Sequence, residues 1–229
     1  MGYLIFRGVN TNSLGNVYVS QMPSHKKAAM RHTEYYVKGR DGALHVDEGF
    51  ENFDIKVKLV LMDASAYTRQ LVNAWADGTG KLITSDDLTL AYRAAVKDEI
   101  VWSRQLGNSG YFDTATITFN CQPCMYEAVD SQITVTETGA IVNPGSAVAF
   151  PLIQVNGSGD CVFTINGTEI SLSGVTDPVY IDCETGYVYT ASGAATMTGD
   201  FPELSLGSNA IGITSGVTSL VITPHWRWV

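Results

Sequence analysis

Two cysteines, Cys121 and Cys124, are separated by two residues, which is the spacing of redox dithiols and of half a zinc site. A redox pair normally opens a helix, whose N-terminus lowers the thiol pKa. Here the pair closes a strand-like stretch, "TATITFN", and no helical pattern follows. A zinc site needs a second close pair of ligands, whereas Cys161, Cys183 and the histidines are scattered along the chain. We predict that the cysteines are small buried residues at a strand end, with no metal bound.

Carboxylates and histidines are the next groups that could carry acid–base chemistry. Asp182 and Glu184 are the best pair for glycoside hydrolysis, but carboxylates two residues apart at a strand end are more typical of a solvated turn. No histidine lies in a nucleophile-elbow or catalytic-loop context, and neither GxGxxG nor a P-loop is present. We therefore predict no catalytic residue and no cofactor.

Two tryptophans near the C-terminus form a possible binding surface. In "HWRWV", Trp226 and Trp228 fall on one face of a strand. Exposed tryptophans stack on sugars or anchor a partner, while a closing strand also buries them in a core. The core interpretation is the simpler one, and the interface interpretation is retained beside it.

A second interface candidate is the turn formed by Gly39, Arg40, Asp41 and Gly42. The flanking stretches "HTEYYVKG" and "ALHV" predict a β-hairpin over residues 32–46. The two glycines supply the positive φ that a tight connection needs. Arg40 and Asp41 could pair within or across subunits, although an exposed pair contributes only ~0–1 kcal/mol.

Charge is distributed unevenly along the 229 residues. Residues 1–130 contain 13 Lys and Arg against 15 Asp and Glu, whereas residues 131–229 contain only Arg227 against eight acidic residues. This asymmetry predicts two domains, residues 1–130 and 131–229. It also argues against nucleic-acid binding by the second, because phosphate contacts need cations. No membrane-length apolar run and no signal-peptide pattern is present, so we expect no membrane insertion and reduced cysteines.

The first half has the patterns of an α+β domain. Residues 52–62 alternate as a half-buried strand. A helix is predicted from Asp63 as the N-cap, with Tyr67, Leu71 and Trp75 as its core-facing stripe and Gly78 ending it. Further strands are expected over residues 81–85, 88–96 and 114–121. Together they predict one helix on a mostly antiparallel sheet.

The second half contains only short strands and turns. Asn166-Gly167 lies between two alternating runs and predicts a hairpin over residues 161–172. A second hairpin is expected over residues 179–190, turning at residues 184–186. "NAIGIT" and "SLVITPHW" add two more strands without an intervening helix. This spacing predicts a β-sandwich.

Taken in order, these motifs resemble the distal tail proteins (Dit) of long, flexible-tailed bacteriophages over nearly the whole chain. The matching stretches are "YYVKGRDGAL", "FENFDIKVKLVL", "YTRQLVNAWADGTGKLI" and "ATITFNCQPCMYE" in the first half. "VNPGSAVAFPLIQVNGSGDCVFTINGTEI", "VYIDCETGYVYT" and "FPELSLGSNAIGIT" follow in the second. Cys124, next to the aromatic position held by Tyr126, departs from the family pattern.

The resemblance implies a mainly β structural protein of the virion, made in the host cytoplasm and located at the tail tip. Its first domain, an antiparallel sheet or split barrel with a hairpin arm, would form a hexameric ring. Its second, a galectin-like β-sandwich, would project outward. The implied partners are other copies of the chain, the tail tube protein, a tail-associated hub or fibre protein and a receptor-binding protein. No catalysis is implied.

Three alternatives remain from the residues themselves. A carbohydrate-binding or adhesion module is favoured by the second domain and its tryptophans. A glycan hydrolase is favoured only by the acidic composition. A tail tube subunit is a third possibility, although such subunits usually lack a separate second sandwich.

Overall fold

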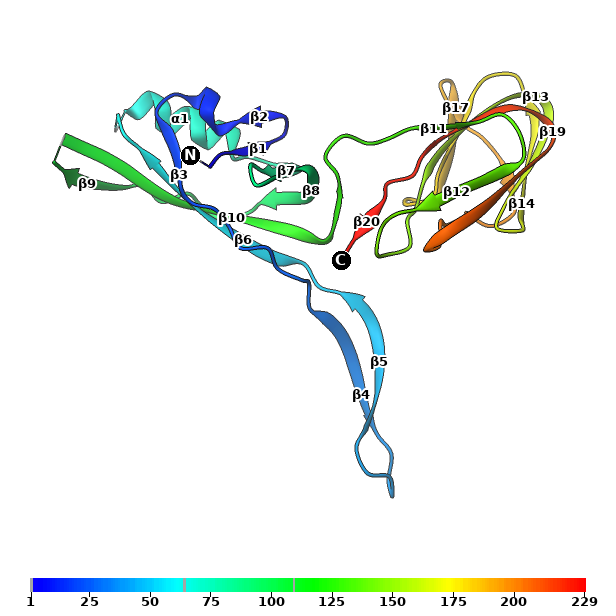
Figure 1. Cartoon of the computed structure of the whole chain (residues 1–229), viewed down its shortest axis with the longest axis horizontal. Coiled ribbons are helices and arrows are strands. Elements are labelled where there is room, and N and C mark those ends of the chain that lie inside the picture. Colours follow the sequence, from blue (N-terminus) through cyan, green and yellow to red (C-terminus); the bar gives the residue numbers. More distant parts are fainter. Residues whose placement is uncertain (1, 64, 109) are drawn as a thin grey trace. The chain divides into compact units, whose positions relative to one another are not determined.

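The computed structural model describes residues 2–63, 65–108 and 110–229 (Figure 1). It divides into two compact units, Met1–Ala128 together with Val229, and Val129–Trp228. The boundary expected from the charge asymmetry, between residues 130 and 131, falls close to this division. No helix among the described residues is both long and apolar enough to cross a membrane.

The first unit is built on a curled antiparallel sheet with the strand order β2-β1-β7-β8-β10-β6-β3, and β9 pairs with one end of β10. Its strands are β1 (Leu4–Phe6), β2 (Val9–Asn10), β3 (Val17–Gln21), β6 (Phe53–Leu61), β7 (Thr79–Thr84), β8 (Asp87–Val96), β9 (Ser103–Gly107) and β10 (Gly110–Glu127). A short 3₁₀ helix, Thr11–Leu14, connects β2 to β3. The mainly β fold with one α-helix in this unit, as predicted, is confirmed.

Strand β6 shows why this sheet forms where the sequence predicts it. Its residues alternate between a buried face, which includes Val57 and Leu59, and an exposed face, which includes Lys56 and Lys58. Antiparallel pairing with β10 places Val57 opposite Ile117, so both strands bury their apolar residues on the same side.

Helix α1 (Ala66–Trp75) covers the buried side of this sheet. Its N-cap is Ser65, whose hydroxyl accepts a hydrogen bond from the Tyr67 backbone N–H, so the predicted cap at Asp63 is wrong. Asp63 instead braces the start of the helix by accepting from Ser65 N–H and Thr68 Oγ1. The predicted stripe is also shifted, since Tyr67 is 69% exposed. The buried helix residues are Thr68, Val72 and Trp75.

Three aromatic rings fix α1 onto the sheet. Phe6, Trp75 and Phe119 pack edge to face, with ring centroids 5.2 to 6.1 Å apart. The indole N–H of Trp75 donates to the carbonyl of Val9 at 3.0 Å, so the buried polar atom of the ring is satisfied. These tertiary contacts stabilise α1, which at ten residues would be only marginally stable as an isolated helix.

Strand β10 continues through the CxxC stretch and does not end there. Cys121 and Cys124 are both buried inside β10, and a β-bulge between Cys121 and Met125 shifts its register with β8. The burial predicted for this pair is confirmed, while the predicted strand end is wrong. A bulge lets the chain bend and resume pairing, which no local pattern signals.

The second unit is a β-sandwich whose two layers share strands. The strands of the sandwich are β11 (Ile133–Val135), β12 (Gly139–Asn143), β13 (Leu152–Ile165), β14 (Thr168–Val175), β15 (Val179–Asp182), β16 (Tyr187–Thr190), β17 (Gly193–Ala194), β18 (Met197–Thr198) and β19 (Gly207–Thr223). The short strand β20 (Arg227–Trp228) follows β19 in the chain. The predicted hairpin at Asn166-Gly167 is confirmed, with φ of 52° and 83° at the two turn residues. The hairpin of β15 and β16 is confirmed as well.

The two long strands β13 and β19 pair with each other along both halves. One half of β13 also pairs with β15 and the other with β14, so each long strand runs from one layer into the other. The sequence predicts two separate strands where β19 is continuous. The bend in β19 occurs at Gly216, which has φ +68°, and a Cβ there would lie 2.2 Å from the carbonyl oxygen of Asp160. Only glycine permits this close approach.

Candidate functional site on the hairpin arm

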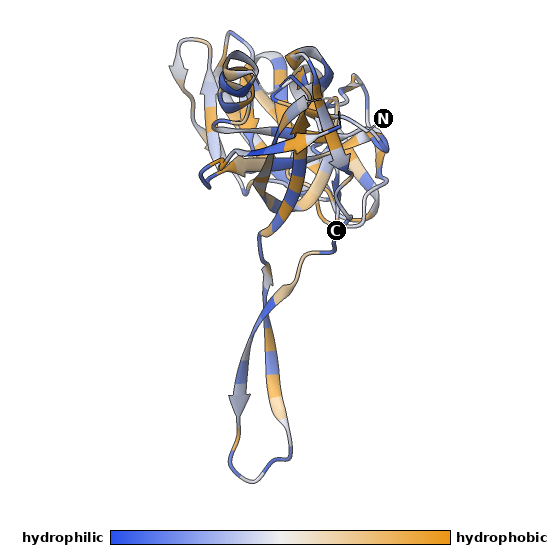
Figure 2. Ribbon diagram, turned by 90° about the vertical axis from the view of Figure 1, so that its left-hand side faces the viewer, coloured by the Kyte–Doolittle hydropathy of each residue, from blue (hydrophilic) through white to orange (hydrophobic). Residues whose placement is uncertain are grey.

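Strands β4 (Met30–Tyr36) and β5 (Ala43–Phe50) form a two-stranded sheet of their own, which we call the arm (residues 30–50). Figures 1 and 2 show it as a long hairpin extending from the first unit. The predicted hairpin over residues 32–46 is confirmed and is longer than expected. Nearly every arm residue is exposed, in contrast to the strands of the main sheet.

The four predicted turn residues occupy the tip of the arm. Gly39 and Gly42 have φ of +83° and +76°, as the turn requires, and the Arg40 backbone N–H donates to the Val37 carbonyl at 3.1 Å. In the described part of the chain, neither Arg40 nor Asp41 forms an ion pair. The tip is therefore a solvated corner whose two charges are available to another molecule.

The arm has two chemically different faces, because directly paired residues of an antiparallel hairpin point to the same side. Tyr35 lies opposite Leu44 and Thr33 opposite Val46, which gives one face that is mostly apolar. We call this the apolar face of the arm. The other face, the polar face, carries His32, Glu34, Tyr36, His45 and Asp47. The alternation in the sequence predicts the hairpin. Which residues share a face is known only once the pairing of β4 with β5 is known.

The apolar face is exposed to a degree that is unusual for a monomer. Tyr35, Leu44 and Val46 are 56%, 39% and 50% exposed. A lone two-stranded hairpin is marginally stable in water, and contiguous exposed apolar surface marks an interaction site. An arm with this composition is suited to lying against another protein surface.

A second exposed apolar region lies where β9 and β10 meet. Leu106 is directly opposite Tyr111, and both side chains are mostly exposed. A shallow groove of about 700 Å³ lies along the edge strand β3 and is lined by residues that include Tyr18, Val60 and Met62. Sequence reasoning did not single out these residues, because their exposure follows only from the sheet order that leaves β3 at an edge.

Trp226 and Trp228, the other predicted interface residues, belong to the second unit. Trp226 is 4% exposed and is part of the core with residues such as Ile153 and Leu204. Trp228 is partly buried against the same core. The burial of Trp226 agrees with the interpretation of this residue as part of the core, and little of its indole surface is available to a ligand.

Two side chains that could do chemistry, the Cys121 thiol and the His25 imidazole, have surroundings that do not activate a nucleophile. Burial raises the pKa of the Cys121 thiol to about 12, which removes it as a nucleophile or a redox group at neutral pH. His25 Nε2 lies 2.7 Å from Asp86 Oδ2, as in an oriented general base. The atom facing its other ring nitrogen is the hydroxyl of Tyr92, at 3.4 Å, and burial raises the pKa of that phenol. The His25–Asp86 pair therefore faces a phenol hydroxyl that is not activated as a nucleophile.

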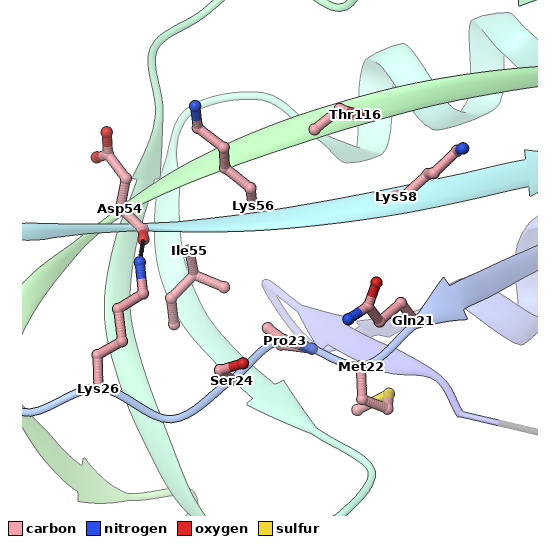
Figure 3. Close-up of a pocket in the computed structure, with 10 residues that line it drawn as sticks. All are labelled: Gln21, Met22, Pro23, Ser24, Lys26, Asp54, Ile55, Lys56, Lys58 and Thr116. Carbon is pink, nitrogen blue, oxygen red and sulfur yellow. Dashed lines mark hydrogen bonds between the residues drawn. The ribbon is translucent and has the colours of Figure 1, made fainter.

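A groove of about 360 Å³ lies beside the segment that leads from β3 towards the arm. Figure 3 shows the residues that line it. Lys56 and Lys58 from the exposed face of β6 line it, and Lys26 crosses it to donate to the Asp54 carbonyl at 3.1 Å. Its lining is cationic and open to solvent. This arrangement suits contact with an acidic surface and contains no acid–base pair aimed at a common point.

Two arginines, one of them half exposed, pair with a buried carboxylate and link the β9–β10 hairpin to α1. Asp113, 1% exposed, accepts from Arg69 Nη1 at 2.5 Å and from Arg104 Nε at 3.0 Å. The hydrogen bonds from Arg104 and Arg69 lower the pKa of Asp113 despite the opposing effect of its burial. Sequence reasoning missed this aspartate, because its partners come from elements far apart in the chain.

Comparison with known proteins adds the decisive observation. No family model and no curated protein matches the sequence. The crystal structure of the Dit protein of phage SPP1, described as a paradigm of the hub adsorption apparatus in phages that infect Gram-positive bacteria, matches over 100% of both chains with a TM-score of 0.76 and 16% sequence identity. The chain has the fold of a phage distal tail hub protein.

The Dit fold extends to baseplate structures of another phage. Two structures of the phage P2 baseplate in its activated conformation, one with Ca and one with Sr, match with TM-scores of 0.52. They are 12% and 11% identical to this chain, which is covered over 96% and 97% of its length. The fold that the motif order predicts is confirmed, although the sequence identities are only 11–16%.

Proposed function

We propose that this protein is a structural component of a phage virion, a distal tail hub whose first unit assembles into a hexameric ring through its arms. The arm of each copy would lie with its apolar face against the neighbouring copy. The observation that carries the proposal is this exposed face on a hairpin without a core of its own, in a chain with the Dit fold throughout.

In this proposal the ring joins the tail tube to the baseplate or tail fibre, and receptor-binding components attach to the second unit. The exposed apolar region of Leu106 and Tyr111 and the edge strand β3 offer further contact surfaces on the first unit. The exposed contact surfaces, together with the fold, support a non-enzymatic scaffold located at the tail tip.

The test is the mass of the full chain in solution and its dependence on concentration. We expect the native chain to assemble into rings visible by negative-stain electron microscopy. A chain in which a short Gly-Ser linker replaces residues 31–48 should remain monomeric. Its thermal unfolding should be unchanged, because the arm contributes little to either core. Rings formed without the arm, or a native chain that stays monomeric up to its solubility limit, would contradict the proposal.

A carbohydrate-binding role is the second candidate, and one observation in the second unit favours it. Tyr180, Tyr189 and Tyr187 form a stacked row on one face of β15 and β16, with centroid distances of 5.2 and 5.8 Å. Tyr187 ends the row and is 54% exposed. A flat, exposed ring of this kind can stack on the apolar face of a sugar.

This second role is tested on a glycan array with the full chain. The Tyr187→Ala variant should lose any signal that the native chain gives, because the exposed ring of the row is removed. Tyr67→Ala is the matched control, since Tyr67 is an exposed tyrosine in the first unit. No signal from the native chain, or equal loss in both variants, would eliminate the tyrosine row as a sugar site.

A further inference from the structure

The polar face of the arm gathers three side chains whose donor atoms can bind a metal ion. His32 Nε2 lies 3.7 Å from Glu34 Oε1, and His45 Nδ1 lies 3.6 Å from the same oxygen. All three donor atoms lie within 4.8 Å of one another. Among the described residues, no other three histidine, cysteine or carboxylate side chains have donor atoms this close together.

The backbone of the hairpin fixes this grouping. Glu34 is directly opposite His45 in the register, and His32 is two residues before Glu34 on the same strand. Side chains at these positions point to one face, and those directly opposite each other lie about 5 Å apart at their Cβ atoms. The three groups therefore converge because of strand pairing, and no long loop has to be ordered to bring them together.

A neighbouring side chain orients the carboxylate. The hydroxyl of Tyr36, on the same face, donates to Glu34 Oε2 at 2.8 Å. That hydrogen bond leaves Oε1 directed at the two imidazoles. Metal ligands commonly have an outer partner of this kind, which sets their orientation.

We propose that His32, Glu34 and His45 bind a divalent transition-metal ion of the Zn²⁺ type on the polar face of the arm. Two imidazole nitrogens and one carboxylate oxygen suit such an ion and disfavour Ca²⁺ or Mg²⁺, which prefer oxygen ligands. Ligand atoms around tetrahedral Zn²⁺ are about 3.3 Å apart, given metal–ligand distances of about 2.0–2.1 Å. The 3.6 and 3.7 Å distances thus need only small side-chain rotations.

The fourth coordination position belongs to water in a single chain. Asp47, paired with His32 in the register and on the same face, is the next oxygen donor along the arm. Bound metal would cross-link β4 to β5 midway along the hairpin and rigidify it. The proposal concerns the arm itself and stands whether or not the chain forms a ring.

The test is a titration of the full, tag-free chain with Co²⁺, which gives visible absorption bands when bound by nitrogen and oxygen ligands in tetrahedral geometry. We expect one saturable site per chain, with the bands removed by Zn²⁺ and unaffected by Ca²⁺. His45→Ala and Glu34→Gln should abolish the bands. Tyr36→Phe should weaken binding about 10–100-fold, the usual effect of losing an outer partner.

The matched control is His25→Gln, which removes an exposed histidine outside the arm. It should leave the titration unchanged. All four substituted side chains are exposed, so circular dichroism should show the native fold in every variant. A native chain without a saturable Co²⁺ site would overturn the proposal. Binding that survives His45→Ala, or that His25→Gln removes equally, would also overturn it.

Discussion

The apolar face of the arm permits a quantitative test of assembly. The triple variant Tyr35→Thr, Leu44→Thr and Val46→Thr removes this face while keeping a residue that favours strands at each position. We expect it to fold as the native chain does, because none of the replaced side chains belongs to either hydrophobic core. It should nevertheless assemble much less tightly, because the proposed interface would lose its apolar contacts.

The magnitude follows from the exposed fractions of the three side chains. Full burial of such a side chain stabilises by about 1.5–3 kcal/mol, and between two fifths and three fifths of each remains exposed in the single chain. Burying the remainder in an interface is then worth about 2–4 kcal/mol for one arm. This corresponds to a roughly 30- to 700-fold increase in the dissociation constant of the variant.

The assay is sedimentation velocity over a dilution series, with thermal unfolding of the same samples. The control is Tyr36→Thr, which removes an even more exposed tyrosine from the polar face. It should leave the dissociation constant within a few-fold of native. If the triple variant assembles as tightly as the native chain, the arm does not bury its apolar face in the assembly and the reasoning fails.

Three further outcomes are expected from the interior. Gly216→Ala should destabilise the second unit by more than about 2 kcal/mol in urea unfolding, because the new Cβ combines a positive φ with a backbone clash. Its control is Gly39→Ala, which also has positive φ but open space around it and should cost only about 1–2 kcal/mol. Asp113→Asn should cost about 1–2 kcal/mol at neutral pH, screening included, and exposed Asp54→Asn almost nothing. The pKa of Asp113 is lowered in the folded chain, so the stabilisation it provides is present above the unfolded pKa of about 3.9 and is lost as the pH falls below it. The melting temperatures of the native chain and Asp113→Asn should therefore converge below about pH 4. Trp226→Ala should cost about 3–5 kcal/mol, which a small change in melting temperature would contradict.

The elements that can be predicted from the sequence are those fixed by neighbours in the chain. Strand β6 follows from the alternation of Val57 and Leu59 with lysines, and the β13–β14 turn follows from Asn166-Gly167. Helix α1 is predictable as an element, but its exact start is not, because Asp63 and Ser65 are both residue types that favour the N-cap position.

The parts that could not be predicted depend on distant segments. The Asp113 network needs Arg69 and Arg104 from other elements, and the bend at Gly216 depends on its approach to Asp160. The histidine–glutamate group of the arm is an intermediate case. The turn at residues 39–42 sets the register that pairs Glu34 with His45, but the side-chain rotamers that bring the donor atoms together are visible only in three dimensions.

The two strands shared by both layers of the second unit have a mechanical consequence. Because β13 and β19 run through each layer, one layer cannot peel away without removing the hydrogen-bonding partners of the other. Tension applied at one rim of the sandwich would pass along continuous backbone to the opposite rim. A module of this construction should therefore unfold as a single cooperative unit, with both layers lost together.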